Sequence, residues 1–142
     1  MATVLTPAEA LDWVFARPRT AKLATVTADG APHVAPIWVA RDGDRLVFNT
    51  GADTLKGRAL ARDPRVSLAF DDEAPPFAFV IVTGTAAISE DLAEVRHWAG
   101  VIGGRYMGED RASEYGERNG VPGELLVTVT PTKVRGVLDI AD

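Results

Sequence analysis

The sequence predicts a small antiparallel β-barrel of the α+β class, formed by a single domain over residues 1–142. Three observations predict this fold. Short runs of strand character alternate with tight turn signals, helical segments are inserted after the third and fifth of these runs, and no linker or internal repeat divides the chain. With 46% hydrophobic residues, a chain of this length can bury a sizeable core. We expect about seven strands and two to three helices.

The first third of the chain predicts one helix and three strands. Thr6-Pro7-Ala8-Glu9 has the pattern of a capping box, and the helix after it should end before Pro18. Asp29-Gly30 and Asp42-Gly43 are dipeptides typical of tight hairpin turns. The strand runs that these turns separate are Ala21–Thr27, His33–Arg41 and Arg45–Thr50. This pattern indicates an antiparallel meander.

A basic segment, residues 49–65, follows the third run. Its lysine and arginines outnumber its two aspartates, although the whole chain has a net charge of -5. Asp53 or Thr54 can cap a short helix here, which Asp63-Pro64 ends. Free backbone N–H groups at a helix start and the side chains of Lys56 and Arg58 both favour an anion such as phosphate. A surface helix with ordinary solvated charges is the alternative interpretation.

The remaining chain predicts further strands around one long helix. Two strands, Arg65–Asp71 and Phe77–Ser89, precede the helix, and Gly84 marks a bulge or a close backbone approach in the second of them. The helix begins after Ser89-Glu90-Asp91, and we expect a bend or break near Gly103. Residues 108–123 predict a surface loop or short helix. Two final strands, Glu124–Thr130 and Lys133–Asp139, are expected on either side of Pro131.

Several functional classes are excluded by composition. The chain has no cysteine, which excludes a thiol nucleophile and a Cys-ligated metal site. It has two histidines, His33 and His97, and no Gly-x-Ser-x-Gly motif, so no serine-type triad is visible. No histidine or carboxylate pair has the spacing of a known metal motif. We therefore expect no catalytic triad and no metal site.

Charge and hydropathy also limit the partners. The net charge of -5 argues against nucleic-acid binding. No apolar run approaches the roughly 20 residues that cross a bilayer, and the N-terminus lacks the basic start of a signal peptide. We expect no nucleic-acid or membrane partner and a cytoplasmic location.

A series of segments extends over nearly the whole chain and points to a family. In order, it is Leu23–Val26, Asp29–Trp38, Phe48-Asn49-Thr50, Lys56-x-Arg58, Arg62–Leu68, Arg105–Gly108, Pro122–Val127 and Pro131–Val134. This series resembles the pyridoxamine 5'-phosphate oxidase-like split β-barrel family. Within that family it is most similar to the branch of flavin/deazaflavin oxidoreductases that use coenzyme F420.

The resemblance implies an FMN-binding-like split β-barrel, a homodimer and a cofactor held in a groove between subunits. The implied cofactor is coenzyme F420, with FMN as the alternative. Pro36, Ile37 and Trp38 would line the ring of the cofactor, and Asn49 and Thr50 would close the third strand beside it. The implied phosphate-binding residues are Thr54, Lys56 and Arg58. The chain departs from the family pattern at Thr54, where a basic residue is common, and at Ala59, where asparagine is common.

The function that the resemblance implies is hydride transfer from reduced F420 to a small conjugated substrate. The cofactor would carry the chemistry, so no residue is assigned a catalytic role. Two alternatives remain open: an FMN-dependent oxidase or reductase, and a protein that binds a flavin or deazaflavin without turnover. The arginine-rich C-terminal substrate signature of pyridoxamine phosphate oxidases is missing, since Val134–Asp139 holds one arginine. Trp38, Trp98 and Tyr106 offer flat surface either to a substrate or to the core.

Overall fold

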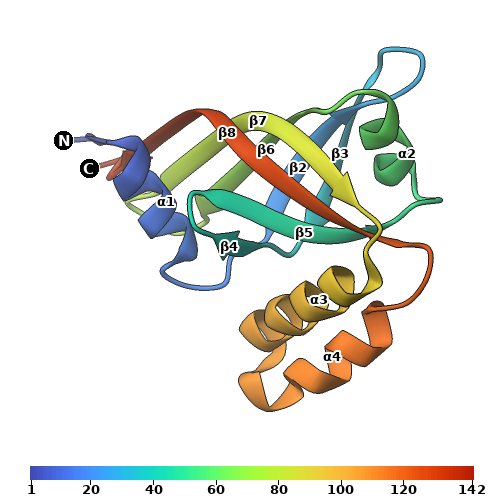
Figure 1. Cartoon of the computed structure of the whole chain (residues 1–142). Helices are drawn as coiled ribbons and strands as arrows, with labels where there is room; N and C mark the ends of the chain where they lie inside the picture. Colours follow the sequence, from blue (N-terminus) through green and yellow to red (C-terminus); the bar gives the residue numbers. More distant parts are fainter.

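In the computed structural model, which describes residues 1–142, one antiparallel sheet curls into a split barrel with helices at its ends and side (Figure 1). Its strands follow the order β3-β2-β6-β7-β8-β5-β4, and β1 pairs with β8. The strand bounds are β1 Thr3–Leu5, β2 Ala21–Val26, β3 Pro32–Ile37, β4 Ala40–Asp42, β5 Arg45–Gly51, β6 Arg65–Asp72, β7 Ala78–Ser89 and β8 Glu124–Leu138. The helix bounds are α1 Pro7–Phe15, α2 Leu55–Arg62, α3 Leu92–Met107, the 3₁₀ turn η1 Glu109–Arg111 and α4 Ala112–Asn119. The α+β split-barrel prediction is confirmed.

Tight turns connect the hairpins as the sequence predicts. Gly30 and Gly43 have φ angles of 83° and 62°, a region that glycine occupies without steric cost. The hairpins that they close are β2–β3 and β4–β5. The expected antiparallel pairing is therefore confirmed.

The run His33–Arg41 is not one strand but two. β3 pairs with β2 and β4 pairs with β5, so the chain crosses from one end of the sheet to the other between them. At this crossing the backbone N–H of Val39 donates to the hydroxyl of Tyr106, 3.1 Å away, and not to a neighbouring strand. The single predicted strand is wrong because a side chain from α3 takes the hydrogen bond that would have continued the ladder.

The two strands predicted around Pro131 are one strand, β8. Its ladder with β7 shifts register between Thr83 and Gly84, so that Thr132 is an extra residue on β8. The bulge accommodates the missing N–H of Pro131 without ending the strand. A Cβ at Gly84 would lie 2.4 Å from the carbonyl oxygen of Thr130, which confirms the close approach expected at that glycine.

Helices cover both ends of the barrel. α1 begins with the predicted capping box, in which the Glu9 N–H donates to Thr6 Oγ1 (3.2 Å) and the Thr6 N–H donates to Glu9 Oε1 (3.0 Å). It buries Ala10, Leu11 and Val14 at one end of the sheet. α2 lies at the opposite end (Figure 1). No helix combines the length and the apolar composition needed to span a bilayer.

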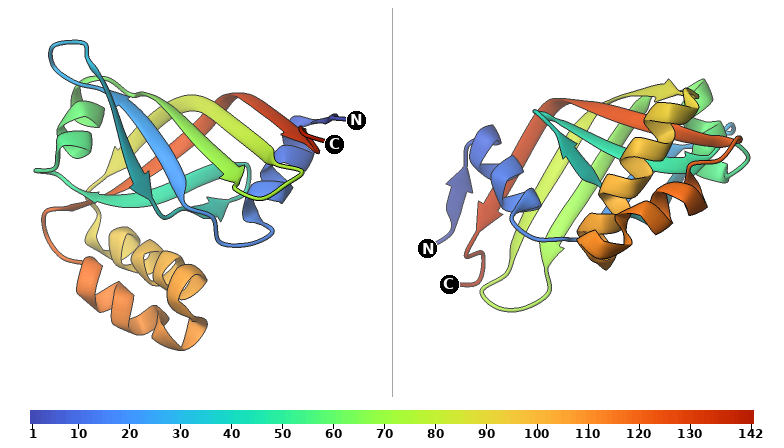
Figure 2. Two further views of the ribbon diagram at one scale, coloured as in Figure 1. Left: turned by 180° about the vertical axis from the view of Figure 1, so that it is seen from behind. Right: turned by 60° about the horizontal axis from the view of Figure 1, so that its bottom comes forward.

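The hairpin of α3 and α4 packs outside the barrel, across β4, β5 and β8 (Figure 2). α3 is continuous from Leu92 to Met107, so the break expected near Gly103 is wrong. Gly103 is buried because α4 crosses α3 there, which makes it a packing residue. The surface segment 108–123 contains η1 and α4, so the helix count exceeds the two to three expected.

Two separate hydrophobic clusters hold these parts together. The barrel core has 18 buried residues, with Phe48, Phe70, Leu23 and Leu68 among the largest that are fully buried. A second cluster of five joins the hairpin to the barrel and consists of Ala40, Val47, Val95, Ile102 and Leu126. The barrel and the hairpin therefore meet over a small apolar contact, with a cavity beside it.

Candidate functional site

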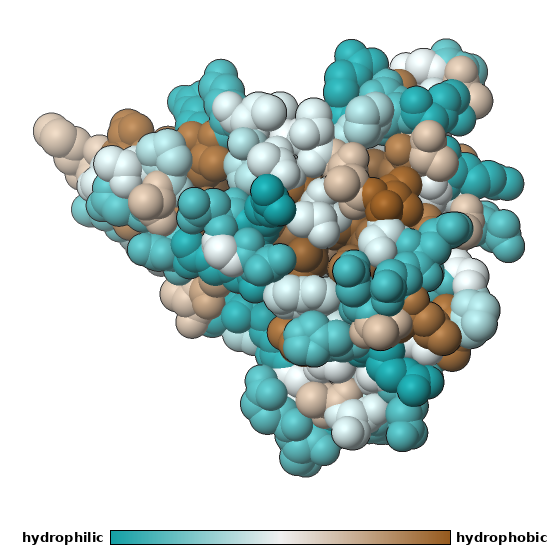
Figure 3. All heavy atoms as spheres, viewed as in Figure 1, coloured by the Kyte–Doolittle hydropathy of each residue, from teal (hydrophilic) through white to brown (hydrophobic).

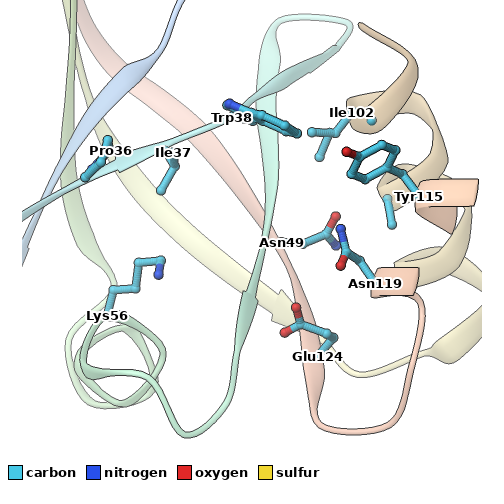
Figure 4. A pocket seen from close by; sticks show the side chains of 11 residues that line it. Pro36, Ile37, Trp38, Asn49, Lys56, Ile102, Tyr115, Asn119 and Glu124 are labelled. Atoms are coloured by element: carbon cyan, nitrogen blue, oxygen red, sulfur yellow. The ribbon is translucent and has the colours of Figure 1, made fainter. Parts of the chain in front are cut away.

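A cavity of about 310 Å³ lies between the barrel and the α3–α4 hairpin (Figure 4). One wall comes from β3, β5, α2 and the start of β8, and the other wall comes from α3 and α4. The lining residues are Pro36, Ile37, Trp38, Asn49, Lys56, Ala99, Ile102, Gly103, Tyr115, Asn119 and Glu124. Its volume lies at the lower end of the range typical of ligand sites.

The β3 wall offers a flat, mainly apolar surface. β3 is an end strand that pairs only with β2, so its other edge has no partner strand. Pro36 has no N–H group, which suits an unpaired edge. Ile37 is buried, while Trp38 is 37% exposed. The wall therefore presents an indole ring and strand backbone to the cavity.

The ring of Trp38 is held in place from behind. It stacks on Tyr106 with ring centroids 4.9 Å apart and an interplanar angle of 5°. The Tyr106 hydroxyl donates to the Arg19 carbonyl oxygen (2.6 Å) and accepts from the Val39 N–H (3.1 Å). Tyr106 thus joins three segments and fixes the indole, although Tyr106 itself does not line the cavity.

The start of α2 borders the cavity, and its capping residue is Thr54. Thr54 Oγ1 accepts from the Gly57 N–H (3.0 Å) and donates to the Gly51 carbonyl oxygen (2.8 Å). Since the Thr54 proton is used in this way, Thr50 donates across the 3.0 Å between the two hydroxyl oxygens. Both hydroxyls are engaged within the protein, and neither Thr50 nor Thr54 lines the cavity.

The cationic residues of α2 differ in position. Lys56 lies in the second position of α2, lines the cavity and forms no ion pair. Arg58 is exposed and outside the cavity lining. The first N–H groups of a helix have no intrahelical partner, so Lys56 and the helix start present positive charge on the same side. This arrangement fits an anionic group.

Asn49, on β5, also lines the cavity. Its Nδ2 donates to the Leu125 carbonyl oxygen (3.3 Å), which leaves a second N–H as a donor and Oδ1 as an acceptor. Of the eight residues selected from the sequence, the structure therefore brings five to the cavity: Pro36, Ile37, Trp38, Asn49 and Lys56.

Three further lining residues were not selected from the sequence. Tyr115 and Asn119 lie on α4 and Glu124 begins β8 (Figure 4). Tyr115 is buried and its ring lies 6.2 Å from that of Trp38. Partial burial raises the pKa of Glu124, and the charge of Lys56 opposes this effect. Tyr115 and Asn119 lie in a polar segment with no motif of its own, and Glu124 was predicted only as the first residue of a strand.

Fold and cavity together define a split-barrel protein with a cavity between its barrel and a helical hairpin. The pyridoxamine 5'-phosphate oxidase family matches residues 7–138. The chain belongs to this family, which confirms the resemblance seen in the sequence. No curated protein matches the chain.

Solved structures share the fold. A conserved hypothetical protein from Mycobacterium tuberculosis is 26% identical with a TM-score of 0.80, over 93% of this chain and 84% of that one. An F420 reductase is 24% identical with a TM-score of 0.66, over 87% of this chain and 94% of that one. A FAD-binding protein from Mesorhizobium loti is 19% identical with a TM-score of 0.71, over 96% and 97% of the two chains. At these identities the last two show the fold alone.

Proposed function

We propose that the chain binds a phosphate-bearing flavin or deazaflavin in the cavity and acts as an F420-dependent oxidoreductase on a small conjugated substrate. One observation carries this proposal: the cavity joins an apolar lining, with Ile37 and Trp38 on one side and Tyr115 on the other, to the unpaired lysine at the start of α2. A planar ring system with an anionic tail has the same two parts. The residues present therefore fit such a cofactor.

Each part of the site has a distinct task in this proposal. Lys56 and the start of α2 bind the phosphate, while Arg58 adds positive charge from the surface. The edge of β3 and the indole of Trp38 orient the ring, and the α3–α4 hairpin excludes water from its other side. When bound, the reduced cofactor supplies the hydride. The protein contributes orientation, so no acid–base pair is required.

The choice of F420 has support from two sources. The order of sequence segments is most similar to the F420-using branch of the family, and an F420 reductase shares the fold over most of both chains. FMN remains the second candidate because the FAD-binding protein from Mesorhizobium loti also shares the fold.

We also propose a cytoplasmic homodimer. The outward side of the sheet carries Val34, 66% exposed, and Ile81 and Ile88, each more than one third exposed. In the space-filling view, apolar areas interrupt the surface over the sheet, while the α3–α4 hairpin is mainly hydrophilic (Figure 3). A second copy would cover such residues. Sedimentation of the purified protein across a concentration series tests this, and a monomer at every concentration would contradict it.

The binding experiment is a titration of the purified protein with F420 and with FMN, followed by tryptophan fluorescence. Turnover of reduced F420 with activated alkenes and conjugated carbonyl compounds then distinguishes an enzyme from a binding protein. Binding of neither cofactor overturns the proposal. Tight binding of FMN with weak binding of F420 transfers the protein to the FMN-dependent alternative.

A variant test addresses the phosphate directly. Lys56→Met should weaken F420 binding about tenfold or more, because it removes a charge-assisted contact. It should leave unchanged the binding of the phosphate-free deazaflavin core of F420. Lys133→Met is the matched control, since Lys133 is exposed on β8 and outside this cavity. Equal losses for both ligands would remove Lys56 from the phosphate site.

A further inference from the structure

Glu124 is the only carboxylate that lines the cavity. It is the first residue of β8 and lies opposite Gly51 of β5, where a Cβ would come within 3.4 Å of its Oε2. It is partly buried, and its carboxylate accepts no hydrogen bond from the protein and forms no ion pair. A carboxylate in such surroundings lacks the N–H or O–H donors that ordinarily compensate for lost water.

Lys56 does not supply the missing donor. It points into the cavity from the opposite side (Figure 4) and makes no ion pair with Glu124. Its charge acts on Glu124 only at longer range. In the proposed function, moreover, Lys56 binds the phosphate of the cofactor. A ligand that fills the cavity and displaces water from this partly exposed carboxylate is then the source of a donor for Glu124.

Two amides stand beside Glu124 in the cavity (Figure 4). The Asn49 Nδ2 gives one of its two N–H groups to the Leu125 carbonyl oxygen, so Asn49 keeps one N–H donor and its Oδ1 acceptor. Asn119 makes no side-chain hydrogen bond within the protein, which leaves its NH₂ group available as a donor. The cluster thus combines a strong acceptor with a neighbouring donor. A cyclic imide, with an N–H between two carbonyl groups, presents the complementary pattern.

We propose that Glu124, together with Asn49 and Asn119, forms a subsite that reads the N–H and carbonyl edge of a pyrimidinedione ring. Glu124 accepts the ring N–H, and the Asn119 amide donates to an adjacent ring carbonyl. This inference rests on the proposed function, because the ring edge is that of the flavin or deazaflavin. It assigns the discriminating contact with the ring to residues of β5, the start of β8 and α4, away from the β3 wall and from Lys56.

Methylation of the ring nitrogen tests the subsite. FMN and F420 are each compared with their N3-methyl derivatives, which keep the phosphate but lose the N–H. Wild-type protein should bind the methylated form of its cofactor about tenfold or more weakly, as a lost charged hydrogen bond requires. Glu124→Ala should bind both forms with nearly equal affinity, and Asn119→Ala should reduce the discrimination in part. Glu117→Gln, an exposed α4 residue outside this cavity, is the matched control.

The outcomes separate this inference from the proposed function. Cofactor binding without discrimination against the N3-methyl form overturns the subsite and leaves the proposed function standing. A second outcome is that Glu124→Ala unfolds like the wild-type protein and still binds the N3-methyl form more weakly. The ring N–H then contacts another group, which also overturns the subsite. Binding of neither cofactor overturns both proposals.

Discussion

Gly103 of α3 lies against Tyr115 of α4 so closely that a Cβ at position 103 would be 2.2 Å from the Cβ of Tyr115. Tyr115 lines the cavity beside Trp38, so the distance between the two helices also sets the position of the aromatic wall. A glycine with low helix propensity therefore shapes the cavity.

Gly103→Ala should destabilise the protein by about 1–2 kcal/mol, because the cost of overpacking exceeds the gain in helix propensity. It should also weaken cofactor binding through displacement of Tyr115. Denaturant unfolding and the fluorescence titration measure the two effects. Gly104→Ala is the control, since its Cβ would first meet the flexible end of Glu109, 3.0 Å away. Equal effects of the two substitutions would contradict this account.

Tyr106→Phe should destabilise the protein by about 1–3 kcal/mol, because it leaves the Val39 N–H and the Arg19 carbonyl without their partner. The phenyl ring keeps its stack on Trp38, so the effect isolates the hydroxyl. Thermal unfolding measures the stability, and tryptophan fluorescence reports the mobility of the indole. Unchanged stability would show that water replaces the hydroxyl at no cost.

Thr54→Ala should cost about 0.5–2 kcal/mol, the usual loss for a helix N-cap. It also removes the acceptor for the hydroxyl of Thr50, which is 4% exposed. Thr54→Ser keeps the hydroxyl and should retain most of the stability. Chemical denaturation of the two variants provides the comparison, and equal losses would assign the effect to the methyl group of Thr54.

Lys56→Met should raise the pKa of Glu124 further, because partial burial raises this pKa and the charge of Lys56 lowers it. A carboxyl group with a raised pKa holds its proton more tightly in the folded than in the unfolded state. The contribution of Glu124 to the free energy of unfolding therefore falls as the pH rises above 4.5, the ordinary pKa of this carboxyl group. Carbon-detected NMR titration of the side chain measures the shift. A lower pKa in the variant would contradict the assigned cause.

Asp63 should titrate with a pKa of about 2, because the Arg65 side chain and backbone both donate to its carboxylate. The ionised Asp63 carboxylate stabilises the folded state fully above pH 3.8, its ordinary pKa. This stabilisation is lost as the pH falls through about 2. NMR titration of the carboxyl carbon of this partly buried residue measures the pKa. Arg65→Gln should return the pKa toward 3.8, and an unchanged titration would show that Arg65 is not the cause.

Local sequence signals predicted most of the sheet. They were wrong where contacts between residues far apart in the sequence determine the strands. The turns at Gly30 and Gly43 depend on adjacent residues, so they were visible in the sequence. Pro131 interrupts a strand pattern, yet β8 continues because β7 provides a glycine opposite the bulge. The strand β1 was missed because its three residues are ordered by pairing with the far end of the chain, Gly136–Leu138.

The residues of the candidate site fall into the same two groups, those predicted from local sequence and those placed by distant contacts. Residues next to a recognisable pattern, such as Trp38 and Lys56, were selected from the sequence and line the cavity. Thr54 was selected as a phosphate ligand through the family resemblance, but its hydroxyl caps α2, the other role that the sequence indicated for it. Asn119 reaches the cavity because α4 folds back on α3, and Glu124 because β8 pairs with β5 opposite Gly51. A single sequence does not show either packing.

The separation of the two hydrophobic clusters has a consequence for hydrogen exchange. Because only five buried residues join the hairpin to the barrel, α3 and α4 have less buried apolar area to lose on opening than β6 and β7, which lie within the core of 18. We expect their amides to exchange through a partial opening of lower free energy than global unfolding. The hairpin would then be a foldon of its own, and one wall of the cavity would open while the barrel stays folded.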